Sequence, residues 1–153
     1  TDSLGIQSNT FDIWGVQAES GSVATAFQTA TGTIQGETSA CQRYYFRSGA
    51  SGGVVTSAYN LHAIGYQEST TVAAIAFKLP ITMRIAPTAI EYANVDIYDS
   101  SPRSISALTI NSSYNNPNIP QLLATGTGMV QYRPCSLINW NNTGGYVALT
   151  AEL

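Results

Sequence analysis

The feature that most constrains the fold is a series of short runs rich in Val, Ile, Thr, Tyr and Phe, which continues along all 153 residues. Clusters of Gly, Ser, Asn and Pro separate these runs, and no segment sustains a 3.6-residue apolar period. This pattern is typical of an all-β sandwich or barrel. We predict an antiparallel jelly-roll-like β-sandwich with a single helical turn at Gly36–Gln42. The predicted strands are Thr10–Glu19, Val23–Phe27, Arg43–Ser48, Val54–Tyr66, Thr71–Leu79, Ala89–Tyr98, Ser104–Ile110, Gln121–Val130 and Gly145–Leu153.

Two of these strands have an apolar face that alternates with a more polar one, as expected for half-buried strands. In the last strand the predicted inward set is Val147, Leu149, Ala151 and Leu153, and the outward set is Tyr146, Ala148, Thr150 and Glu152. In the strand Thr71–Leu79 the predicted inward set is Ile75, Phe77 and Leu79, with Lys78 pointing outward.

Three segments between the strands contain the residues that favour turns. Ser48–Gly53 and Asn111–Pro120 are rich in Gly, Asn and Pro, and we predict that both are loops. Asn139–Gly145 is predicted to form a hairpin that leads into the last strand, with Asn and Gly taking the positive-φ positions.

The surface of this protein carries unusually little charge. Only 10% of the residues are charged, against roughly 25% in average soluble domains. Self-assembly would cover such a surface, and we predict a homo-oligomer; the alternative is a monomer that stays soluble through hydroxyl and amide groups. The net charge is −3 and the six basic residues are scattered, so no nucleic-acid footprint is present. No apolar run reaches the roughly 20 residues that span a bilayer, so we expect no membrane insertion.

Catalytic motifs are absent from the sequence. The only histidine, His62, lies between Leu61 and Ala63 in a predicted strand, and no G-x-S-x-G elbow accompanies it. The acids can be paired in many ways, but none forms a distinct glycosidase pair, and Asp96 and Asp99 fit a strand end feeding a turn. We therefore predict a non-enzymatic protein without a cofactor or a metal. Weak calcium binding by oxygen ligands in Asn94–Asp99 and Asn139–Thr143 is the alternative left open.

Recognition of a ligand is the chemistry that remains. Nine tyrosines and two tryptophans occur with many Asn and Gln residues, and this combination suits sugars, because aromatic faces stack on pyranose rings while amides match their hydroxyls. The alternative is that these residues only anchor loops. The candidate receptor- or glycan-binding residues are Trp140, Asn139, Asn141, Asn142, Tyr59, Asn60, Tyr114, Asn115 and Asn116.

Four blocks of the sequence resemble a known family. They read WGVQAESGSVATAF at 14–27, CQRYY at 41–45, KLPITMRIAPT at 78–88 and AEL at 151–153. Together they resemble the C-terminal region of tailed-bacteriophage tail fibre and related virion proteins. The residues of these blocks to which we assign a structural role are Cys41, Gln42, Arg43, Tyr44, Tyr45, Met83, Arg84 and Pro87.

The resemblance implies a setting more than an activity. It implies a virion location, in a tail fibre or another capsid or tail appendage, with assembly in the host cytoplasm as a trimer among other phage structural proteins. In that reducing compartment Cys41 and Cys135 are expected to be free buried thiols. The implied division is 28–153 as a fibre-type β-sandwich domain, with 1–27 either closing a preceding module or opening this one. No signal-peptide pattern is visible, and we expect the chain to be a segment of a longer polypeptide.

Two functions from different classes follow. The first is a receptor-binding module that recognises a host cell-surface glycan or protein without cleaving it. The second is a purely structural module for trimerisation or capsid decoration. A glycan depolymerase is a third and weaker alternative.

Overall fold

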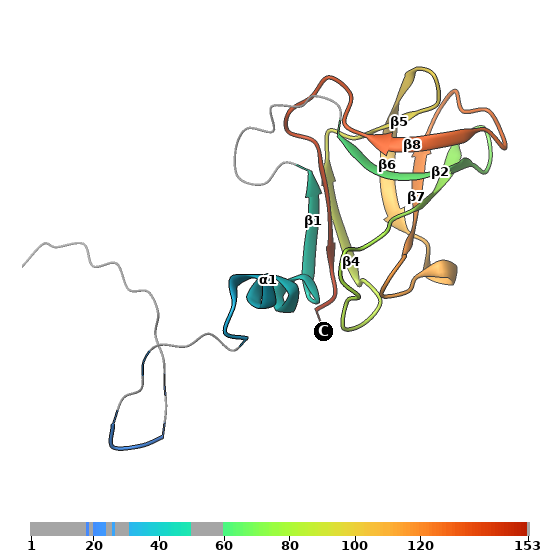
Figure 1. The fold of residues 1–153 in the computed structure, drawn as a ribbon. Helices are drawn as coiled ribbons and strands as arrows, with labels where there is room; N and C mark the ends of the chain where they lie inside the picture. Colours follow the sequence, from blue (N-terminus) through green and yellow to red (C-terminus); the bar gives the residue numbers. More distant parts are fainter. Residues whose placement is uncertain (1–17, 19, 24–25, 27–30, 50–59, 153) are drawn as a thin grey trace, which may run out of the picture. The chain divides into compact units, whose positions relative to one another are not determined.

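The described part of the chain is mostly antiparallel β-structure, as the sequence predicts. The computed structural model describes residues 18, 20–23, 26, 31–49 and 60–152, and the chain divides into two units, 1–37 and 38–153. The predicted strand Thr10–Glu19 apart from Ala18, most of Val23–Phe27, residues 50–59 and Leu153 lie outside the described residues. In chain order the elements are α1 Ile34–Gln42, β1 Tyr45–Gly49, β2 Leu61–Gln67, β3 Val72–Ala76, β4 Ala89–Ala93, β5 Asp96–Tyr98, β6 Pro102–Ile110, η1 Ser112–Tyr114, β7 Gln121–Gly126, β8 Pro134–Ile138 and β9 Tyr146–Thr150 (Figure 1).

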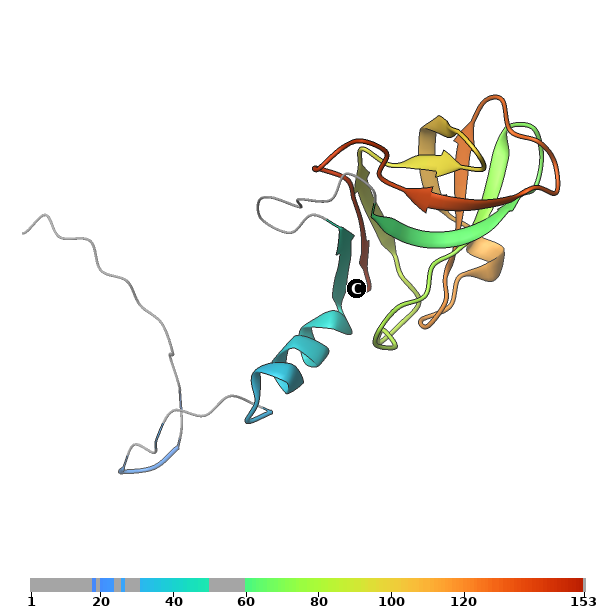
Figure 2. The same ribbon diagram turned by 45° about the horizontal axis from the view of Figure 1, so that its top comes forward.

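Six of the strands close into a barrel in the order β2-β3-β7-β6-β5-β8, and the other three form a sheet in the order β1-β9-β4 (Figure 2). The predicted jelly-roll-like sandwich is therefore wrong, although its antiparallel all-β class is confirmed. A sandwich strand and a barrel strand both alternate between a buried and an exposed face. The period-2 pattern therefore cannot tell the two architectures apart.

The barrel closes at β2, which pairs with β3 along one edge and with β8 along the other. Gly65 lies in the middle of β2, where the neighbouring backbones come very close. A Cβ atom on Gly65 would lie 2.0 Å from the carbonyl oxygen of Ala74 and 2.8 Å from the Cα of Ile75. The strand therefore needs glycine at this position.

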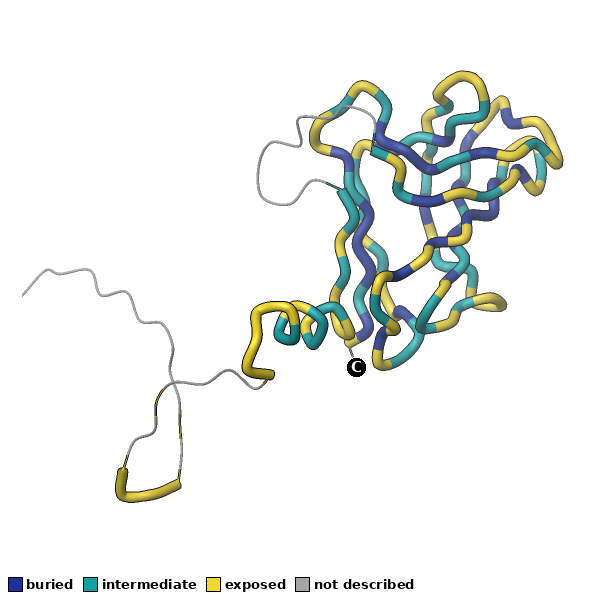
Figure 3. The backbone as a smooth tube through the Cα atoms, in the orientation of Figure 1, coloured by how far each residue is buried: buried dark blue, intermediate teal, exposed yellow. Residues whose placement is uncertain are grey.

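A single apolar core joins the barrel to the three-stranded sheet. Ile75 and Phe77 are buried from the barrel side, and Val147 and Leu149 are buried from β9, which confirms the predicted inward faces. Phe46 of β1 meets Phe77 edge to face, with ring centroids 6.2 Å apart. Figure 3 shows the buried residues concentrated along β9 and on alternate positions of the barrel strands. The predicted core residues Leu79 and Ala151 are also buried, and Lys78 is exposed as predicted.

Ala148 departs from the predicted outward set, because it is almost completely buried. It lies on β9, the central strand of the sheet, and its cross-strand neighbours are Arg47 on β1 and Glu91 on β4. As a small residue on the central strand, it is flanked on both sides by residues with longer side chains.

Other local predictions also differ from the structure. The strand predicted at Gln121–Val130 ends at Gly126, and Ser48 and Gly49 of the loop predicted at Ser48–Gly53 belong to β1. The strand predicted at Ala89–Tyr98 is two strands, because Asn94 between them has a φ of 51°. β8 was not predicted, since it is short and begins at a proline. Asn139–Gly145 is not a hairpin, because β8 pairs only with barrel strands and β9 only with β1 and β4.

The predicted helical turn and one predicted loop are confirmed. α1 covers the predicted turn and has Thr33 before its first residue, with the hydroxyl oxygen accepting a bond of 3.0 Å from the amide of Gly36. Residues 111–120 form a loop with a single 3₁₀ turn. Pro117 and Pro120, which have no N–H, contribute only carbonyl oxygens, to the amides of Met83 and Phe77.

A buried charged cluster ties the β5–β6 turn to the neighbouring segments. The side chain of Asp99 is fully buried and accepts bonds from Gln67 at 2.8 Å, Arg103 at 3.1 Å and Arg133 at 3.3 Å. Burial alone would raise the pKa of Asp99, but these hydrogen bonds and the charge of Arg103 hold it below its usual range. Gln67, which is also fully buried, accepts a hydrogen bond from the amide of Val130 in the β7–β8 loop.

We predict that Gly65→Ala destabilises the barrel by about 2–3 kcal/mol or more, because the new methyl group would push β2 and β3 apart. Chemical denaturation followed by circular dichroism measures the change. Thr109→Ser, at an exposed position on β6, should shift stability by less than about 0.5 kcal/mol. If Gly65→Ala were as stable as the parent chain, the close approach of the β2 and β3 backbones at Gly65 would not be what requires glycine there.

Candidate functional site

A hollow of about 310 Å³ opens where the β4–β5 junction, β6 and the β8–β9 loop meet. Its lining combines amide, hydroxyl and carboxylate groups with aromatic and aliphatic side chains. The polar residues of the lining are Asn94, Asp96, Ser104 and Asn142, and the others are Tyr92, Val95, Ile105 and Trp140.

Asn139 holds the β8–β9 loop in place beside this hollow. It is fully buried, and its side-chain oxygen accepts a bond of 3.0 Å from the amide of Asn60. Its side-chain nitrogen donates to the carbonyl oxygen of Asn142 at 2.5 Å. The side-chain oxygen of Asn142 in turn accepts from the amide of Gly144 at 2.9 Å. The loop is therefore fixed before any ligand arrives.

The backbone of the loop lies close to the β4–β5 junction. A Cβ atom on Gly145 would lie 2.2 Å from the Cβ of Asn139 and 2.7 Å from the carbonyl oxygen of Asn94. Asn94 and Asn141 both have positive φ, at 51° and 48°, a conformation that Asn tolerates better than most residues. The two segments that were considered for calcium are thus brought together.

Trp140 is held by an aromatic neighbour. Its ring stacks on that of Tyr98, with centroids 4.9 Å apart and planes 15° from parallel. Tyr98 is on β5 two residues after Asp96, so the two side chains share a face of the strand. A stacked ring presents a rigid surface at the edge of the hollow.

The structure gathers one part of the predicted patch and separates the other. Asn60, Asn139, Trp140, Asn141 and Asn142 come together around the β8–β9 loop, but of these only Trp140 and Asn142 line the hollow. Asn139 was predicted to bind a ligand, and its burial gives it a supporting role instead. Tyr59 lies outside the described residues.

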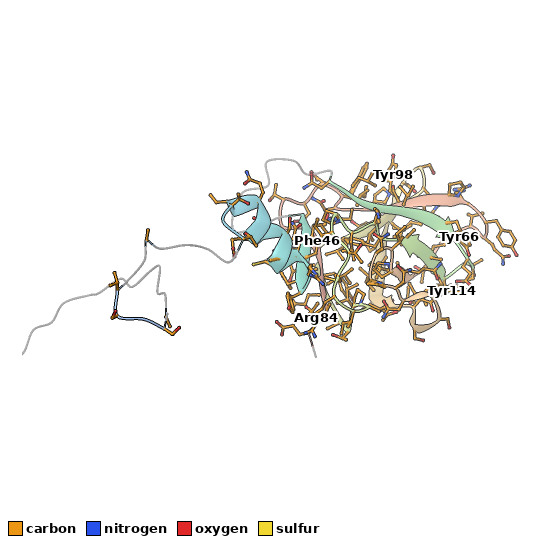
Figure 4. The ribbon with its side chains drawn as sticks, turned by 60° about the horizontal axis from the view of Figure 1, so that its bottom comes forward. Phe46, Tyr66, Arg84, Tyr98 and Tyr114 are labelled. Atoms are coloured by element: carbon orange, nitrogen blue, oxygen red, sulfur yellow. The ribbon has the colours of Figure 1, made fainter. Side chains whose placement is uncertain are left out.

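Tyr114, Asn115 and Asn116 do not belong to this site. They follow the far end of β6 from Ser104, and Figure 4 shows Tyr114 well away from Tyr98. The side-chain amide nitrogen of Asn115 donates to the backbone carbonyl oxygen of Pro87 at 2.8 Å. Asn116 bonds within its own loop, where its side-chain oxygen accepts from the amide of Ile119. Both amides therefore stabilise the loop.

Asp96, Asn94, Ser104 and Tyr92 were not among the predicted binding residues. Asp96 was considered as a hydrolase carboxylate, a turn residue or a calcium ligand, and Asn94 as a calcium ligand. The available signal was local: β5 places Ile97 in the core, so Asp96 and Tyr98 must face outward. The sequence near β5 does not reveal which distant loop folds over that face, so it could not show that Asp96 lines a hollow.

Three of the four blocks that resemble virion proteins, 41–45, 78–88 and 151–153, lie side by side in the described residues. The backbone amide of Arg84 donates to the carbonyl oxygen of Arg43 at 2.9 Å. The backbone amide of Ala151 donates to the carbonyl oxygen of Tyr44 at 2.7 Å. The guanidinium of Arg84 lies 5.2 Å from the centroid of the Tyr44 ring. The remaining residues of these blocks divide by burial: Met83 and Pro87 are buried, Cys41 and Tyr45 are exposed, and Gln42 is partly buried.

A Ser–His pair lies elsewhere, between β1 and β2. The hydroxyl of Ser48 is 3.1 Å from Nδ1 of His62, and the buried Nε2 has no hydrogen-bond partner in the described part of the chain. Burial lowers the pKa of His62 to about 4, against a weaker opposing effect of Asn139. A histidine with so low a pKa is a weak general base near neutral pH.

Both cysteines are free. Cys41 is exposed, so the prediction that both thiols are buried is wrong for this residue; it is on α1, which has no buried residue. Cys135 is buried, and burial together with the charge of Asp99 raises the pKa of its thiol to about 11.

The described residues contain neither a cluster of metal-ligating side chains nor a membrane-spanning helix. No group of three His, Cys, Asp or Glu side chains there is arranged to hold a metal ion. In the same part of the chain no helix has the length and apolar character to cross a membrane.

Comparisons with protein-family models, with curated proteins and with solved structures found no match to this chain.

We predict that acid weakens the fold through His62. Its pKa is about 4 in the folded chain and 6.5 ordinarily, so the unfolded chain binds the proton first as the pH falls. The stability contribution is complete above pH 6.5 and is lost toward pH 4, by about 1–2 kcal/mol after allowance for partial solvent screening. Urea denaturation at several pH values measures it. His62→Gln should flatten the dependence in that window, and an unchanged slope would show that another group is responsible.

Proposed function

We propose that this chain is a non-enzymatic recognition module that binds a saccharide on a bacterial surface. The observation that carries the proposal is the hollow beside Trp140, in which a fixed aromatic ring adjoins the side chains of Asn94, Asp96 and Asn142. An aromatic surface packs against the C–H face of a sugar, while amides and carboxylates bind its hydroxyls.

The size of the hollow favours a small ligand. About 310 Å³ is at the lower end of the range for small-molecule sites, roughly 300–1,000 Å³. A terminal saccharide fits such a volume better than the middle of a long polysaccharide. Because Asn139 fixes the loop internally, little ordering is needed on binding.

Binding without cleavage is the reading that the lining supports. Glycoside hydrolysis commonly uses two carboxyl groups that flank the bond. Among the described residues, Asp96 is the one carboxylate that lines the hollow. His62 is not part of the lining, and its low pKa makes it a poor proton acceptor.

The setting of this function comes from the sequence. The resemblance to tail fibre and related proteins supports a location on a virion that is assembled in the host cytoplasm. Contact with a host surface is the event that a saccharide site would serve there. The ligand would then be a bacterial surface glycan.

We predict that Trp140→Ala weakens saccharide binding at least about tenfold, a loss of roughly 1.4 kcal/mol. Binding of the full chain to glycans from bacterial surfaces, measured on an array and by calorimetry, tests this. Ser104→Trp, which fills the hollow from an exposed position without removing a supporting contact, should have the same effect. Tyr114→Ala is the matched control, because Tyr114 is 66% exposed and remote from the hollow.

Circular dichroism of each variant separates lost binding from lost structure. Equal affinity of Ser104→Trp and the parent chain, or a loss of binding in Tyr114→Ala alone, would contradict the assignment of the site. Release of reducing sugar by the parent chain would contradict the absence of catalysis.

A purely structural module is the second candidate, and one observation favours it. The four consecutive barrel strands β8, β2, β3 and β7 contain no Asp, Glu, Lys or Arg. Leu61, Ile64 and Tyr66 are 61%, 63% and 45% exposed on β2, and Figure 4 shows Tyr66 on the outer surface of the barrel. An uncharged apolar wall of this kind suits contact with other copies of the chain. We propose a homotrimer that uses this wall, an arrangement compatible with recognition because the hollow opens at β5 and β6.

We predict that the assembled chain has three times the 16.2 kDa mass of one copy, and that Ile64→Arg returns it to a single copy. Sedimentation equilibrium measures both masses. Thr109→Arg, an exposed position on β6, should leave the assembly intact. A parent chain that sediments as one copy at high concentration would exclude this mode of assembly.

A further inference from the structure

We propose that Asp96 selects the charge of the ligand, so that the hollow accepts neutral and amino sugars and rejects acidic ones such as uronic acids. This inference rests on the proposed function and specifies its substrate class. It follows from the position of Asp96 and from the positions of every basic side chain in the protein.

Asp96 is directed outward by the strand that carries it. The next residue, Ile97, has no exposed surface, and alternation therefore puts Asp96 on the outer face. Its cross-strand neighbours are Ser104 on β6 and Ile138 on β8. Neither neighbour carries a charge, and Asp96 itself lines the hollow.

No basic side chain within the described residues forms an ion pair with Asp96. All six basic side chains lie within the described residues, and neither ion pair found there involves Asp96. Arg103 and Arg133 are paired with Asp99. The guanidinium of Arg47 lies 3.8 Å from the ring centroid of Tyr146.

The other basic residues are also placed away from the hollow. Arg84 lies over the ring of Tyr44, and Lys78 donates to Asn118 at 2.5 Å. Arg43 precedes β1, at the end of the sheet where Tyr45 pairs with Thr150. The β4–β5 junction that lines the hollow follows the opposite end of that sheet.

The remaining polar groups of the hollow do not discriminate by charge. Asn94, Asn142 and Ser104 offer amide and hydroxyl groups, which bind neutral hydroxyls as well as ionised oxygens. Asp96 is therefore the one group of the lining with a charge preference. A ligand carboxylate in the same hollow would lie well within one Debye length of it, where salt screens incompletely. We expect discrimination of about tenfold, equivalent to about 1.4 kcal/mol.

Matched sugars test this inference. The probes are methyl hexosides of gluco, galacto and manno configuration, each with its uronic acid and its 2-amino derivative, at a pH where the amine is protonated. Calorimetry and ligand-observed NMR with the full chain measure the affinities at low and high ionic strength. We expect each uronic acid to bind about tenfold more weakly than its neutral parent. The amino sugar should bind at least as well as the parent, with an advantage that shrinks as salt is added.

The isosteric variant Asp96→Asn isolates the charge. It should bind neutral and acidic members of a series with similar affinity, and lose the salt-dependent preference for the amine. Ser104→Trp should abolish binding of all members. Equal binding of the neutral sugar and its uronic acid by the parent chain, or unchanged selectivity in Asp96→Asn, would overturn the role of Asp96 while leaving the saccharide site in place. If no sugar of any series bound the parent chain, the proposed function would fall together with this inference.

Discussion

Closure of the barrel by β2 is the constraint on which the rest of this structure depends. β2 is bonded to β3 and β8 at once, so neither of its edges is open to pair with another chain. Closure requires Gly65, where a side chain would meet the backbone of β3. It also sets the position of β8, and thereby of Asn139 and Trp140 directly after it. The geometry of the candidate site is therefore a consequence of strand pairing.

The barrel has two chemically different sides. Among its six strands, only β5 and β6 carry charged residues, Asp96 and Arg103. The strands β8, β2, β3 and β7 are uncharged. This asymmetry reconciles the two proposed functions, because an apolar wall can face other copies while the hollow faces a ligand. The low overall charge of the sequence is thus unevenly distributed over the surface.

The candidate site shows how a buried amide can serve recognition without touching a ligand. Asn139 satisfies backbone groups of Asn60 and Asn142 from a fully buried position. An unsatisfied polar group there would cost about 1–3 kcal/mol, so the loop has a strong preference for one conformation. Trp140, the next residue, stacks on Tyr98. Asn139 therefore positions the loop, while its neighbour Trp140 lines the hollow.

The amino-acid sequence by itself determined the antiparallel β class, the inward faces of β3 and β9, the helix at α1 and the candidacy of Trp140 and Asn142. Each of these follows from periodicity or composition over a few residues, which is a local property of the chain. Only the tertiary structure decided that the strands close into a barrel, that Asn139 is buried, that Tyr114 lies elsewhere and that Asp96 joins the site. Those outcomes depend on which strand edges pair and which loop covers which face, and distant parts of the chain settle both through the burial they gain together.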